Sequence, residues 1–423
     1  MRVVHFKKES FDIYIGRPSK WGNPYAVGED GTRSEVIRKY EWWIRKQPHL
    51  MNSLHELEGK TLGCWCAPKA CHGDVLVKLV KECQMKDVAQ NMVSKGILAA
   101  DESTGTMSKR LATIKAKSNR TNRWKWRDTL LSTPGLENFV SAVILNEETV
   151  GQSPAECSEV PIDPCAKDAT FPEYLAEKGI IPGVKVDKGA KDAAKFPGEL
   201  ITEGLDGLRS RLEKFRKAGC LFAKWRGVLQ AGEDNCISDA VLISNADALA
   251  RYAALCQESG LIPIVEPEVI LTNNRDLATI SNWTLKAIKV TFEHLLHHRV
   301  NLEEMVLKPN MVMSGYDCEE QAPAEEVSQL TINVLMNSVS SKVPGIAFLS
   351  GGQDDELSIE HLNAMNSTIM ELPWRLTFSY GRGLQSDAMA AWGGSDDNVE
   401  LSREVLLARA DRVYKASLGQ IEV

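Results

Sequence analysis

The stretch MVLKPNM, residues 305–311, is an apolar run that carries a single lysine, Lys308, directly before Pro309 and Asn310. It is one of eight short runs of β-branched or apolar residues that recur along most of the chain. In order, the eight runs are GILAADES (96–103), SAVILN (141–146), IPGVKVD (181–187), LFAKWRGV (221–228), IPIVEPEV (262–269), MVLKPNM (305–311), GIAFLSGG (345–352) and LTFSYG (376–381). Each gap between runs is long enough for a helix and two loops, which predicts strands that alternate with helices.

This alternation decides the fold class. Strands joined by helical crossovers lie parallel in one sheet, and eight of them in about 300 residues predict a closed (β/α)8 barrel, the TIM barrel. A doubly wound open sheet is the alternative, but it would carry a GxGxxG fingerprint after its first strand. The sequence contains no such fingerprint.

The first fifth of the chain differs in composition from the remainder. Residues 1–82 carry a net charge of +4, whereas the other residues carry −11, and four of the ten tryptophans fall in this first part. Such a shift predicts two domains. We expect a small α/β domain at residues 1–84, followed by the barrel at residues 85–423.

Composition also excludes several classes of protein. No apolar run approaches the ~20 residues that a membrane-spanning helix needs, so we expect no membrane partner. The start MRVVHFKKESFD lacks the apolar core of a signal peptide. Ten cysteines at irregular spacing, without a secretory signal, predict reduced thiols in a cytoplasmic protein.

Seven of the eight predicted strands end in ionisable groups or in residues suited to phosphate. Barrel enzymes carry their chemistry at these ends. The residues concerned are Asp101, Lys185, Asp187, Lys224, Arg226, Glu266, Glu268, Lys308, Ser350, Gly351, Gly352, Gly381 and Arg382. Residues two apart share one strand face, so both members of a pair can point into the same barrel mouth. One such residue alone would be read as a surface charge, but the whole set predicts a site.

This set of side chains is poorly suited to a metal ion. Histidine is nearly missing from the strand ends, and two carboxylates among lysines make a poor divalent site. The segment HLLHHR (294–299) has three histidines at helical spacing, but it lies between strands and is read as a helix face. We therefore expect neither a metal nor a cofactor in the barrel.

A lysine at the end of a buried strand offers a different chemistry. Its amine can condense with a ketone to an iminium, which then accepts electrons when an adjacent carbon–carbon bond breaks. The amine must be neutral to attack, so the pKa of Lys308 must fall from about 10.4. Apolar surroundings and a second cation, Lys224 or Lys185, would lower it. Glu266 and Asp101 could carry the protons.

Glycines and an arginine after the last two strands specify the substrate class. LSGGQ (349–353) and SYGRG (379–383) place backbone N–H groups and Arg382 where barrels commonly bind phosphate. A plain turn is the alternative for the Gly351–Gly352 pair. Together with the lysine, these segments predict a phosphorylated ketone as substrate.

Seven stretches of the chain resemble class I fructose-bisphosphate aldolase, in family order from about residue 86 to 417. They are KGILAADESTG, GVKVDKG, FAKWRGVL, PIVEPEV, VLKPNMV, FLSGGQ and LTFSYGRGLQSDAMAAWGG. The resemblance implies a lyase that splits fructose 1,6-bisphosphate reversibly into dihydroxyacetone phosphate and glyceraldehyde 3-phosphate. It also implies that Lys308 forms the Schiff base and that Glu266 is the main acid and base.

The resemblance implies roles for the other strand-end residues as well. Asp101, Lys185, Lys224 and Arg226 would bind substrate and relay protons, with Glu268 in support; Ser350, Gly351, Gly381 and Arg382 would bind the phosphate next to the ketone; Thr106 and Arg110, with Lys109, would contact the other phosphate. Family members are usually homotetramers, which we expect here too. A transaldolase-like barrel and an aldolase-shaped scaffold without turnover are the alternatives.

Two features depart from the family pattern. Many members end in a flexible tail whose final tyrosine assists proton transfer, whereas the printed sequence stops at KASLGQIEV (415–423). We therefore expect slow proton exchange on dihydroxyacetone phosphate and weaker discrimination between bisphosphate and monophosphate ketoses. Exchange rates equal to those of tailed relatives would contradict this. The loop between the second and third strands is also long, and we expect its Cys157 and Cys165 to be free surface thiols.

The first domain resembles the DUF4326 family, which has no assigned function, over residues 3–81. The resemblance is carried by YIGRPSKWGNPY (14–25), TRSEVIRKYEWWI (32–44) and LEGKTLGCWCAPKACHGDVLVKLV (57–80). Cys64, Cys66, Cys71 and His72 are weak zinc candidates, because their spacing is not that of a standard zinc finger.

The alternative for this segment is structural. It is a strand–turn–helix in which Cys64 and Cys66 face the core and HGD (72–74) begins the helix. A nucleotide or phosphate could lie against Arg17, Lys20, Trp21 and Asn23. The positive charge and exposed tryptophans allow weak nucleic-acid contact.

Overall fold

A computed structural model describes residues 1–157 and 168–421. The chain forms two compact units, Met1–Asp87 and Val88–Val423, and the division falls within helix α3 (His72–Met92). The predicted boundary between the two domains, with the first ending at residue 84 and the second beginning at residue 85, stays a prediction. Each unit is described by itself below.

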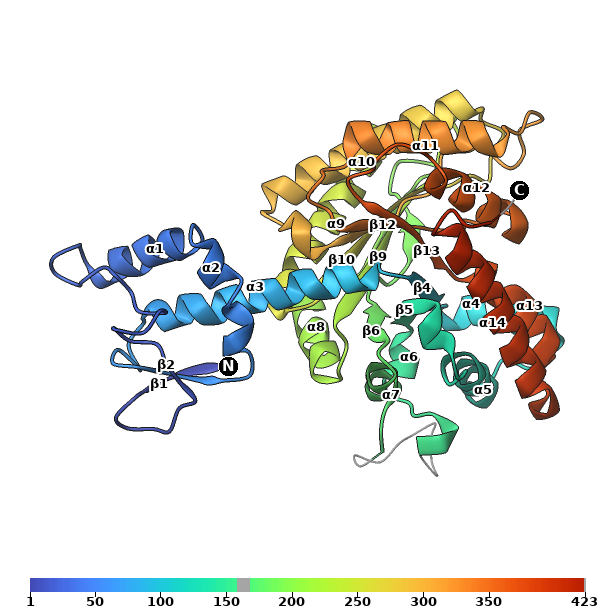
Figure 1. The fold of residues 1–423 in the computed structure, drawn as a ribbon. Helices are drawn as coiled ribbons and strands as arrows, with labels where there is room; N and C mark the ends of the chain where they lie inside the picture. Colours follow the sequence, from blue (N-terminus) through green and yellow to red (C-terminus); the bar gives the residue numbers. More distant parts are fainter. Residues whose placement is uncertain (158–167, 422–423) are drawn as a thin grey trace. The chain divides into compact units, whose positions relative to one another are not determined.

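Eight parallel strands close into a barrel in the second unit, which confirms the predicted fold class (Figure 1). They are β4 (Gly96–Ala100), β5 (Val140–Leu145), β6 (Ile181–Lys185), β9 (Phe222–Leu229), β10 (Ile262–Val269), β11 (Val306–Leu307), β12 (Gly345–Phe348) and β13 (Arg375–Tyr380). Neighbours in the barrel are neighbours along the chain, and β13 pairs with β4 to close the ring, with Ser379 opposite Ile97. All eight predicted runs therefore become barrel strands.

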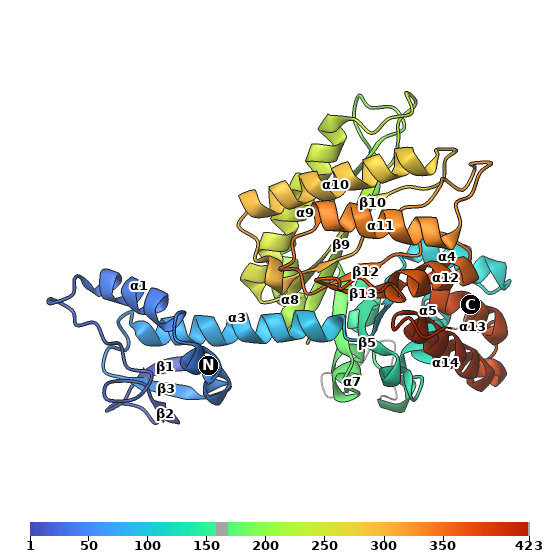
Figure 2. The same cartoon turned by 45° about the horizontal axis from the view of Figure 1, so that its top comes forward.

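Helices surround the barrel (Figure 2). They are α4 (Thr104–Thr113), α5 (Arg120–Leu131), α6 (Glu147–Val150), α7 (Phe171–Glu177), α8 (Leu208–Lys217), α9 (Asp239–Ser259), α10 (Leu277–His297), α11 (Ala324–Ser338), α12 (Asp355–Asn366), α13 (Arg382–Trp392) and α14 (Val399–Ala416). The longest begin at capping residues. Ser238 accepts a hydrogen bond from the Val241 N–H at the start of α9, and Asp276 accepts one from the Thr279 N–H at the start of α10.

Large aromatic rings pack against glycines of the barrel strands. A Cβ atom on Gly96 would lie 1.8 Å from the ring of Phe378, and one on Gly183 would lie 2.4 Å from the ring of Phe222. Both phenylalanines are fully buried. Burial of a side chain of this size stabilises the fold by roughly 1.5–3 kcal/mol, so the glycines make room for rings that hold the strands in a fixed register.

A short hairpin after β6 was not predicted. It consists of β7 (Ala190–Asp192) and β8 (Leu200–Thr202), which pair antiparallel. Its sequence, AKD followed by a loop and LIT, is too short and too polar for a period of two to be recognised. Strand β8 is fixed to α9 by Asn245, whose side-chain oxygen accepts from the Thr202 N–H.

The first unit is the predicted small α/β domain. Its sheet has three parallel strands in the order β1 (Arg2–His5), β3 (Thr61–Cys64), β2 (Ile13–Tyr14). The helices are α1 (Arg33–Ile44), the short α2 (Pro48–Met51) and the beginning of α3. Trp21 is only 2% exposed, and its carbonyl accepts a hydrogen bond from Tyr40. Trp21 is thus a core residue of this domain, whereas the nucleotide or phosphate ligand of its loop stays a prediction.

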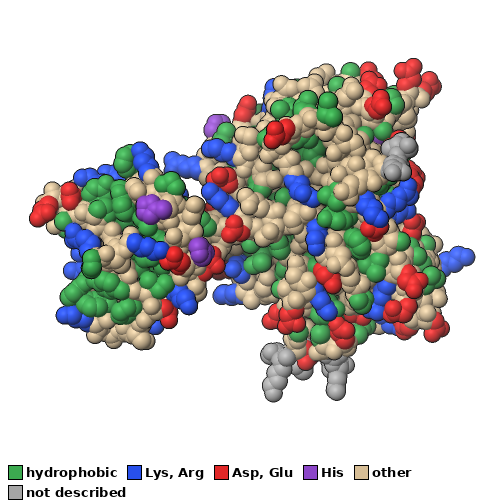
Figure 3. All heavy atoms as spheres, viewed as in Figure 1, with side chains coloured by type: hydrophobic (Ala, Val, Ile, Leu, Met, Phe, Trp, Pro, Cys, Tyr) green, Lys and Arg blue, Asp and Glu red, His purple; other side chains and the backbone are tan. Residues whose placement is uncertain are grey.

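The cysteines of the described residues form no disulfide bonds, and the surface carries charges of both signs. All nine cysteines among the described residues are free thiols, including the half-buried Cys157, whereas Cys165 lies outside the described residues. On the face of the second unit seen in Figure 3, basic and acidic side chains are interspersed. In the described part of the chain, no helix combines the length and apolarity needed to cross a membrane.

Candidate active site

Lys308 follows β11 directly, at the C-terminal edge of the barrel. Its backbone N–H donates to the Val265 carbonyl at 2.8 Å, and the residue is 3% exposed. The side chain of Asn310, two residues after the lysine, joins this segment to its neighbours. Its side-chain oxygen accepts from the Val269 N–H at 3.0 Å, while its amide nitrogen donates to the Thr284 hydroxyl at 3.1 Å. The chain beyond Lys308 is therefore tied to β10 and α10, which fixes the base of the lysine.

Four charged side chains meet at the barrel mouth around Lys224. Its Nζ atom lies 2.8 Å from Oε2 of Glu266 and 3.1 Å from Oδ2 of Asp101. The other carboxylate oxygen of Glu266 lies 3.5 Å from Nζ of Lys308. All four side chains are buried. The structure thus brings together the four residues that were predicted to be catalytic.

Burial and charge act differently on the two lysines. Burial lowers the pKa of Lys308, and the neighbouring Lys224 lowers it further, against the opposing effect of Glu266. Burial also disfavours the charge of Lys224, but Asp101 and Glu266 outweigh it and raise the pKa of Lys224. Lys224 therefore stays protonated, while Lys308 is the amine that loses its proton more easily.

Asp101 is the carboxylate that stays ionised. Burial favours its neutral form, yet the three lysines Lys224, Lys308 and Lys185 outweigh burial and lower the pKa of Asp101. An ionised carboxylate next to a buried amine can accept a proton from a substrate hydroxyl.

A cavity of about 520 Å³ opens beside this cluster. Its lining includes Asp101, Thr106, Arg110, Lys185, Lys224 and Arg226. Lys185 lies 2.9 Å from the carboxylate of Asp187, and Arg226 forms a close ion pair with Glu268. Cations at several points of one cavity suit a substrate with separated anionic groups, and the volume lies in the usual range for small-molecule sites.

The loops after β12 and β13 form a candidate anion site. Gly351 and Gly352 have φ angles of 58° and 105°, which favour glycine, and a Cβ atom on Gly352 would lie 2.7 Å from a guanidinium nitrogen of Arg382. Gly381 is the N-cap of α13, and the first N–H groups of a helix have no helical partner and favour an anion. Ser350 beside them is buried.

This loop is attached to the strand that carries the lysine. The Leu349 N–H donates to the carbonyl of Pro309 at 3.1 Å. Leu349 directly precedes Ser350, the first residue of the anion site, and Pro309 directly follows Lys308. The anion site and the lysine are therefore joined through one backbone hydrogen bond.

Two residues near the mouth were missed by sequence reasoning. Glu102 is buried and contacts Arg110 and Arg127, while its carboxylate accepts from Gln385 at 3.0 Å; it thereby positions the predicted Arg110. Tyr316 has a buried hydroxyl without a hydrogen-bond partner among the described residues, and a Cβ atom on Gly351 would lie 3.5 Å from it. Glu102 directly follows a strand-end residue and could have been found, whereas nothing in the local sequence marks Tyr316.

Comparison with known proteins identifies the family. Residues 84–423 match the family model of class I fructose-bisphosphate aldolase. The chain belongs to this aldolase family. Residues 2–82 match DUF4326, a domain of unknown function, so both resemblances seen in the sequence are confirmed.

Similar aldolases come from distant organisms. The chain is 46% identical over 340 residues to a probable fructose-bisphosphate aldolase class 1 of Xylella fastidiosa, which covers 80% of this chain and 98% of that protein. It is 43% identical over 349 residues to fructose-bisphosphate aldolase 2 of Caenorhabditis elegans. This match covers 82% of this chain and 92% of that protein. A solved structure of Plasmodium falciparum fructose-bisphosphate aldolase, in complex with TRAP and a small-molecule inhibitor, matches this fold with a TM-score of 0.76 and 40% sequence identity. The match covers 81% of this chain and 96% of that chain.

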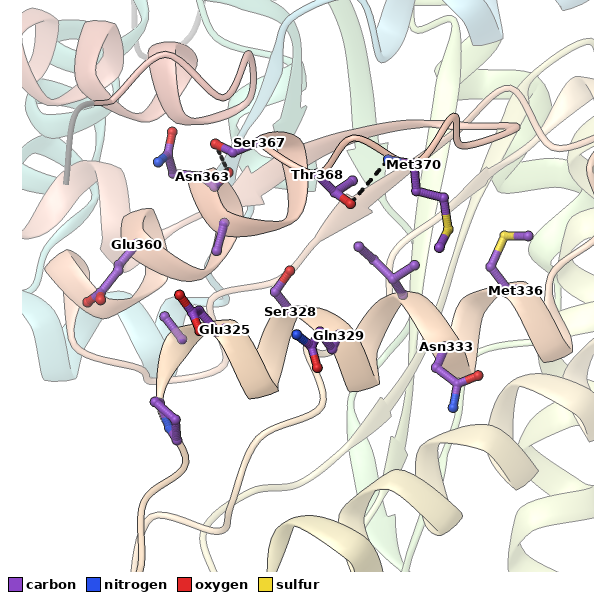
Figure 4. Close-up of a pocket in the computed structure, with 14 residues that line it drawn as sticks. Glu325, Ser328, Gln329, Asn333, Met336, Glu360, Asn363, Ser367, Thr368 and Met370 are labelled. Carbon is purple, nitrogen blue, oxygen red and sulfur yellow. Dashed lines mark hydrogen bonds between the residues drawn. The ribbon is translucent and has the colours of Figure 1, made fainter.

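A larger cavity between two of the helices outside the barrel is a poorer candidate for a phosphate site. It has a volume of about 870 Å³ and lies between α11 and α12, with Met336 and Met370 at one end (Figure 4). Its described lining residues include Glu325 and Glu360 but neither lysine nor arginine. An acidic and apolar cavity repels phosphate, so the smaller cationic cavity is the candidate active site.

Two of the three histidines of HLLHHR, His294 and His297, lie on α10 as predicted, and His298 is the residue that caps the end of this helix. His298 contacts Asp247 at 2.9 Å and His294 lies 3.8 Å from the same carboxylate. Asp247 belongs to α9, so these contacts join α10 and the residue after it to the neighbouring helix.

Proposed function

We propose that the barrel cleaves fructose 1,6-bisphosphate reversibly to dihydroxyacetone phosphate and glyceraldehyde 3-phosphate, through an iminium on Lys308. One observation carries the proposal. A buried lysine whose pKa is lowered lies 3.5 Å from a carboxylate, Glu266, and next to a loop suited to an anion. The names of the similar proteins supply the substrate.

The reaction then follows from the positions of the four buried groups. The neutral amine of Lys308 attacks the ketone carbon, and Glu266 protonates the hydroxyl of the carbinolamine so that it leaves as water. Asp101 accepts the proton of the C4 hydroxyl while the C3–C4 bond electrons move into the iminium, which releases the aldehyde. The enamine then takes up a proton at C3 in exchange for the one that Asp101 removed, and hydrolysis of the iminium by water restores the free lysine and returns a proton to Glu266.

The substrate's two phosphates are assigned to opposite ends of the site. The ketone phosphate would bind the loop of Ser350, Gly351, Gly381 and Arg382, where helix N–H groups and a guanidinium favour an anion. Thr106 and Arg110 on α4 would bind the second phosphate. Lys185 and Arg226, the latter held by Glu268, would contact the hydroxyl groups between them.

Borohydride reduction tests the proposal. Dihydroxyacetone phosphate with borohydride should leave one adduct per chain on Lys308, located by peptide mass spectrometry. Unphosphorylated dihydroxyacetone should react at least about 10-fold more slowly, because each hydrogen bond to a charged phosphate contributes roughly 1.5–3 kcal/mol.

Matched variants test the anion loop in the same assay. Arg382→Ala should lose most of the preference for the phosphorylated ketone, whereas Arg375→Ala, an exposed arginine at the opposite end of β13, should keep it. An adduct on another lysine would overturn the assignment of Lys308. Absence of any adduct would favour the scaffold without turnover, and the aldolase family match already disfavours a transaldolase-like barrel.

Three further expectations stay predictions. They are a homotetramer, a nucleotide or nucleic-acid ligand for residues 1–84, and a cytoplasmic location. The last is supported by similar proteins that are named cytosolic or cytoplasmic in Arabidopsis thaliana and Cicer arietinum.

A further inference from the structure

Two cysteines and a histidine meet in the first unit, at the carboxyl end of the central strand of its sheet. Ligands commonly bind at this end of parallel strands. Strand β3 ends at Cys64, and helix α3 begins at His72, directly after Cys71. In parallel α/β sheets, the carboxyl ends of strands and the starts of the following helices lie at one edge, where binding sites form. This explains why the spacing differs from that of a zinc finger. One ligand comes from a strand end and two come from a helix start.

The three side chains are close enough to share one metal ion. Each offers one ligand atom, and these atoms all lie within 4.8 Å of one another. In tetrahedral zinc sites, bond lengths of ~2.3 Å to sulfur and ~2.0 Å to nitrogen put the ligand atoms about 3.5–3.8 Å apart. Among the described residues, no other group of three or more such side chains meets this spacing. Small side-chain rotations would bring all three atoms to a bound ion.

The histidine is already oriented for metal binding. Its Nε2 atom lies 2.8 Å from the carbonyl oxygen of Ile15. A carbonyl can only accept a hydrogen bond, so Nε2 carries the proton, and in the neutral ring Nδ1 keeps its lone pair. Tyr40 packs edge-on against the same ring, at 5.0 Å between centroids. A ring held by a backbone carbonyl in this way is typical of metal ligands.

Cys71 is held in place as well. Its sulfur accepts a hydrogen bond from the Gly73 N–H at 3.3 Å, and its own N–H donates to the carboxylate of Asp74 at 2.8 Å. These two contacts fix the position of the Cys71 sulfur beside Cys64 and His72. Asp74 is engaged in this cap, which leaves two sulfurs and one nitrogen as the ligands.

A cavity of about 150 Å³ adjoins the three ligands. Its lining also includes Arg17, Asn23, Tyr25, Arg33 and Cys66. One water occupies about 30 Å³, so the cavity can hold a water or a small ligand at a fourth coordination position. Sites with three protein ligands and one open position are typical of zinc that acts on a bound molecule, whereas structural sites are closed by four protein ligands.

We propose that Cys64, Cys71 and His72 bind one Zn²⁺ ion whose fourth position opens into this cavity. The soft sulfur and imidazole ligands select zinc over magnesium or calcium. Arg17 and Arg33 make an oxyanion the fitting fourth ligand. This site is independent of the aldol chemistry proposed for the barrel, which uses no metal.

The test uses the full chain, stripped with a chelator under reducing conditions and then titrated with zinc in competition with a chromogenic chelator. We expect one equivalent of zinc per chain. Cys64→Ser and His72→Gln should weaken binding at least about 10–100-fold, the loss seen when even supporting groups of a metal site are removed. Cys83→Ser, a half-buried cysteine on the same helix that lies outside the cluster, should bind as the parent does. The rate of fructose 1,6-bisphosphate cleavage should be the same in all of these variants.

Cobalt provides a second measurement that does not depend on whether the variants fold. The cobalt-loaded parent chain should show a thiolate-to-cobalt charge-transfer band. A parent chain without this band would overturn the proposal. Zinc that binds equally well to the Cys64→Ser chain would also overturn it, as would a Cys64–Cys71 disulfide in place of bound zinc under reducing conditions.

Discussion

Replacement of Lys308 by methionine should lower kcat for fructose 1,6-bisphosphate cleavage by at least about 10⁴-fold, the scale of loss when a nucleophile that forms the covalent intermediate is removed. The amine forms the bond that activates the ketone, and Glu266 and Asp101 can only move protons around that bond. Methionine has nearly the length of lysine and suits a buried position, so the fold should be kept. KM should change far less than kcat, because the phosphate contacts stay in place.

Lys342→Met is the matched control. Lys342 is an exposed lysine that precedes β12, at the other end of the barrel from the anion loop. It should keep the parent rate and the borohydride adduct, whereas Lys308→Met should lose both. A Lys308→Met chain that retains even a hundredth of the parent kcat, with circular dichroism unchanged, would show that another group carries the reaction.

The barrel could be predicted because its signal is repeated. Eight apolar runs alternate with helical stretches, and an error in one run would not have changed the fold class. Strand bounds were harder to predict. The run 305–311 contains a strand of only two residues, Val306–Leu307. Lys308 still donates to the Val265 carbonyl of β10, but Pro309 has no N–H to donate, so the strand ends there.

The site was predicted less completely than the fold. The ends of the predicted strands, and the alternation of side chains along each strand, identified the site residues. They did not identify which residue contacts which. Lys224 and Lys185 were equal candidates as the neighbour of Lys308, and only the structure shows that Lys224 bridges Asp101 and Glu266 while Lys185 pairs with Asp187. Only the Lys224–Asp101 contact joins strands that are not neighbours in the barrel, β9 and β4, and the local sequence does not record it.

The first domain shows the same limit. Sequence spacing made Cys64, Cys71 and His72 weak metal candidates, because zinc-finger patterns assume ligands from short loops. Their proximity depends on β3 and the start of α3 meeting at one edge of the sheet. Cys66, the fourth weak metal candidate, lies outside the group of three; it is half-buried, packs against the core and lines the cavity.

Replacement of Lys224 by methionine should produce the second large effect, and this effect should depend on pH. The positive charge of Lys224 disfavours protonation of Lys308 and so lowers the pKa of Lys308. Without that charge the pKa of Lys308 rises, and the carboxylates of Asp101 and Glu266, which then lack their shared partner, raise it further. The neutral fraction of Lys308 at a given pH must therefore fall.

Each unit of increase in the pKa of Lys308 lowers its neutral fraction about tenfold at pH well below that pKa. The acidic limb of the kcat/KM profile should thus move to higher pH in Lys224→Met, with a loss of at least about 10-fold at pH 7 that alkaline buffer partly restores. Lys224→Arg keeps the charge and should keep the limb near its parental position. Lys308→Met should not recover at any pH, which separates loss of the amine from a change in its protonation. An unshifted acidic limb in Lys224→Met would mean that burial alone sets the protonation of Lys308.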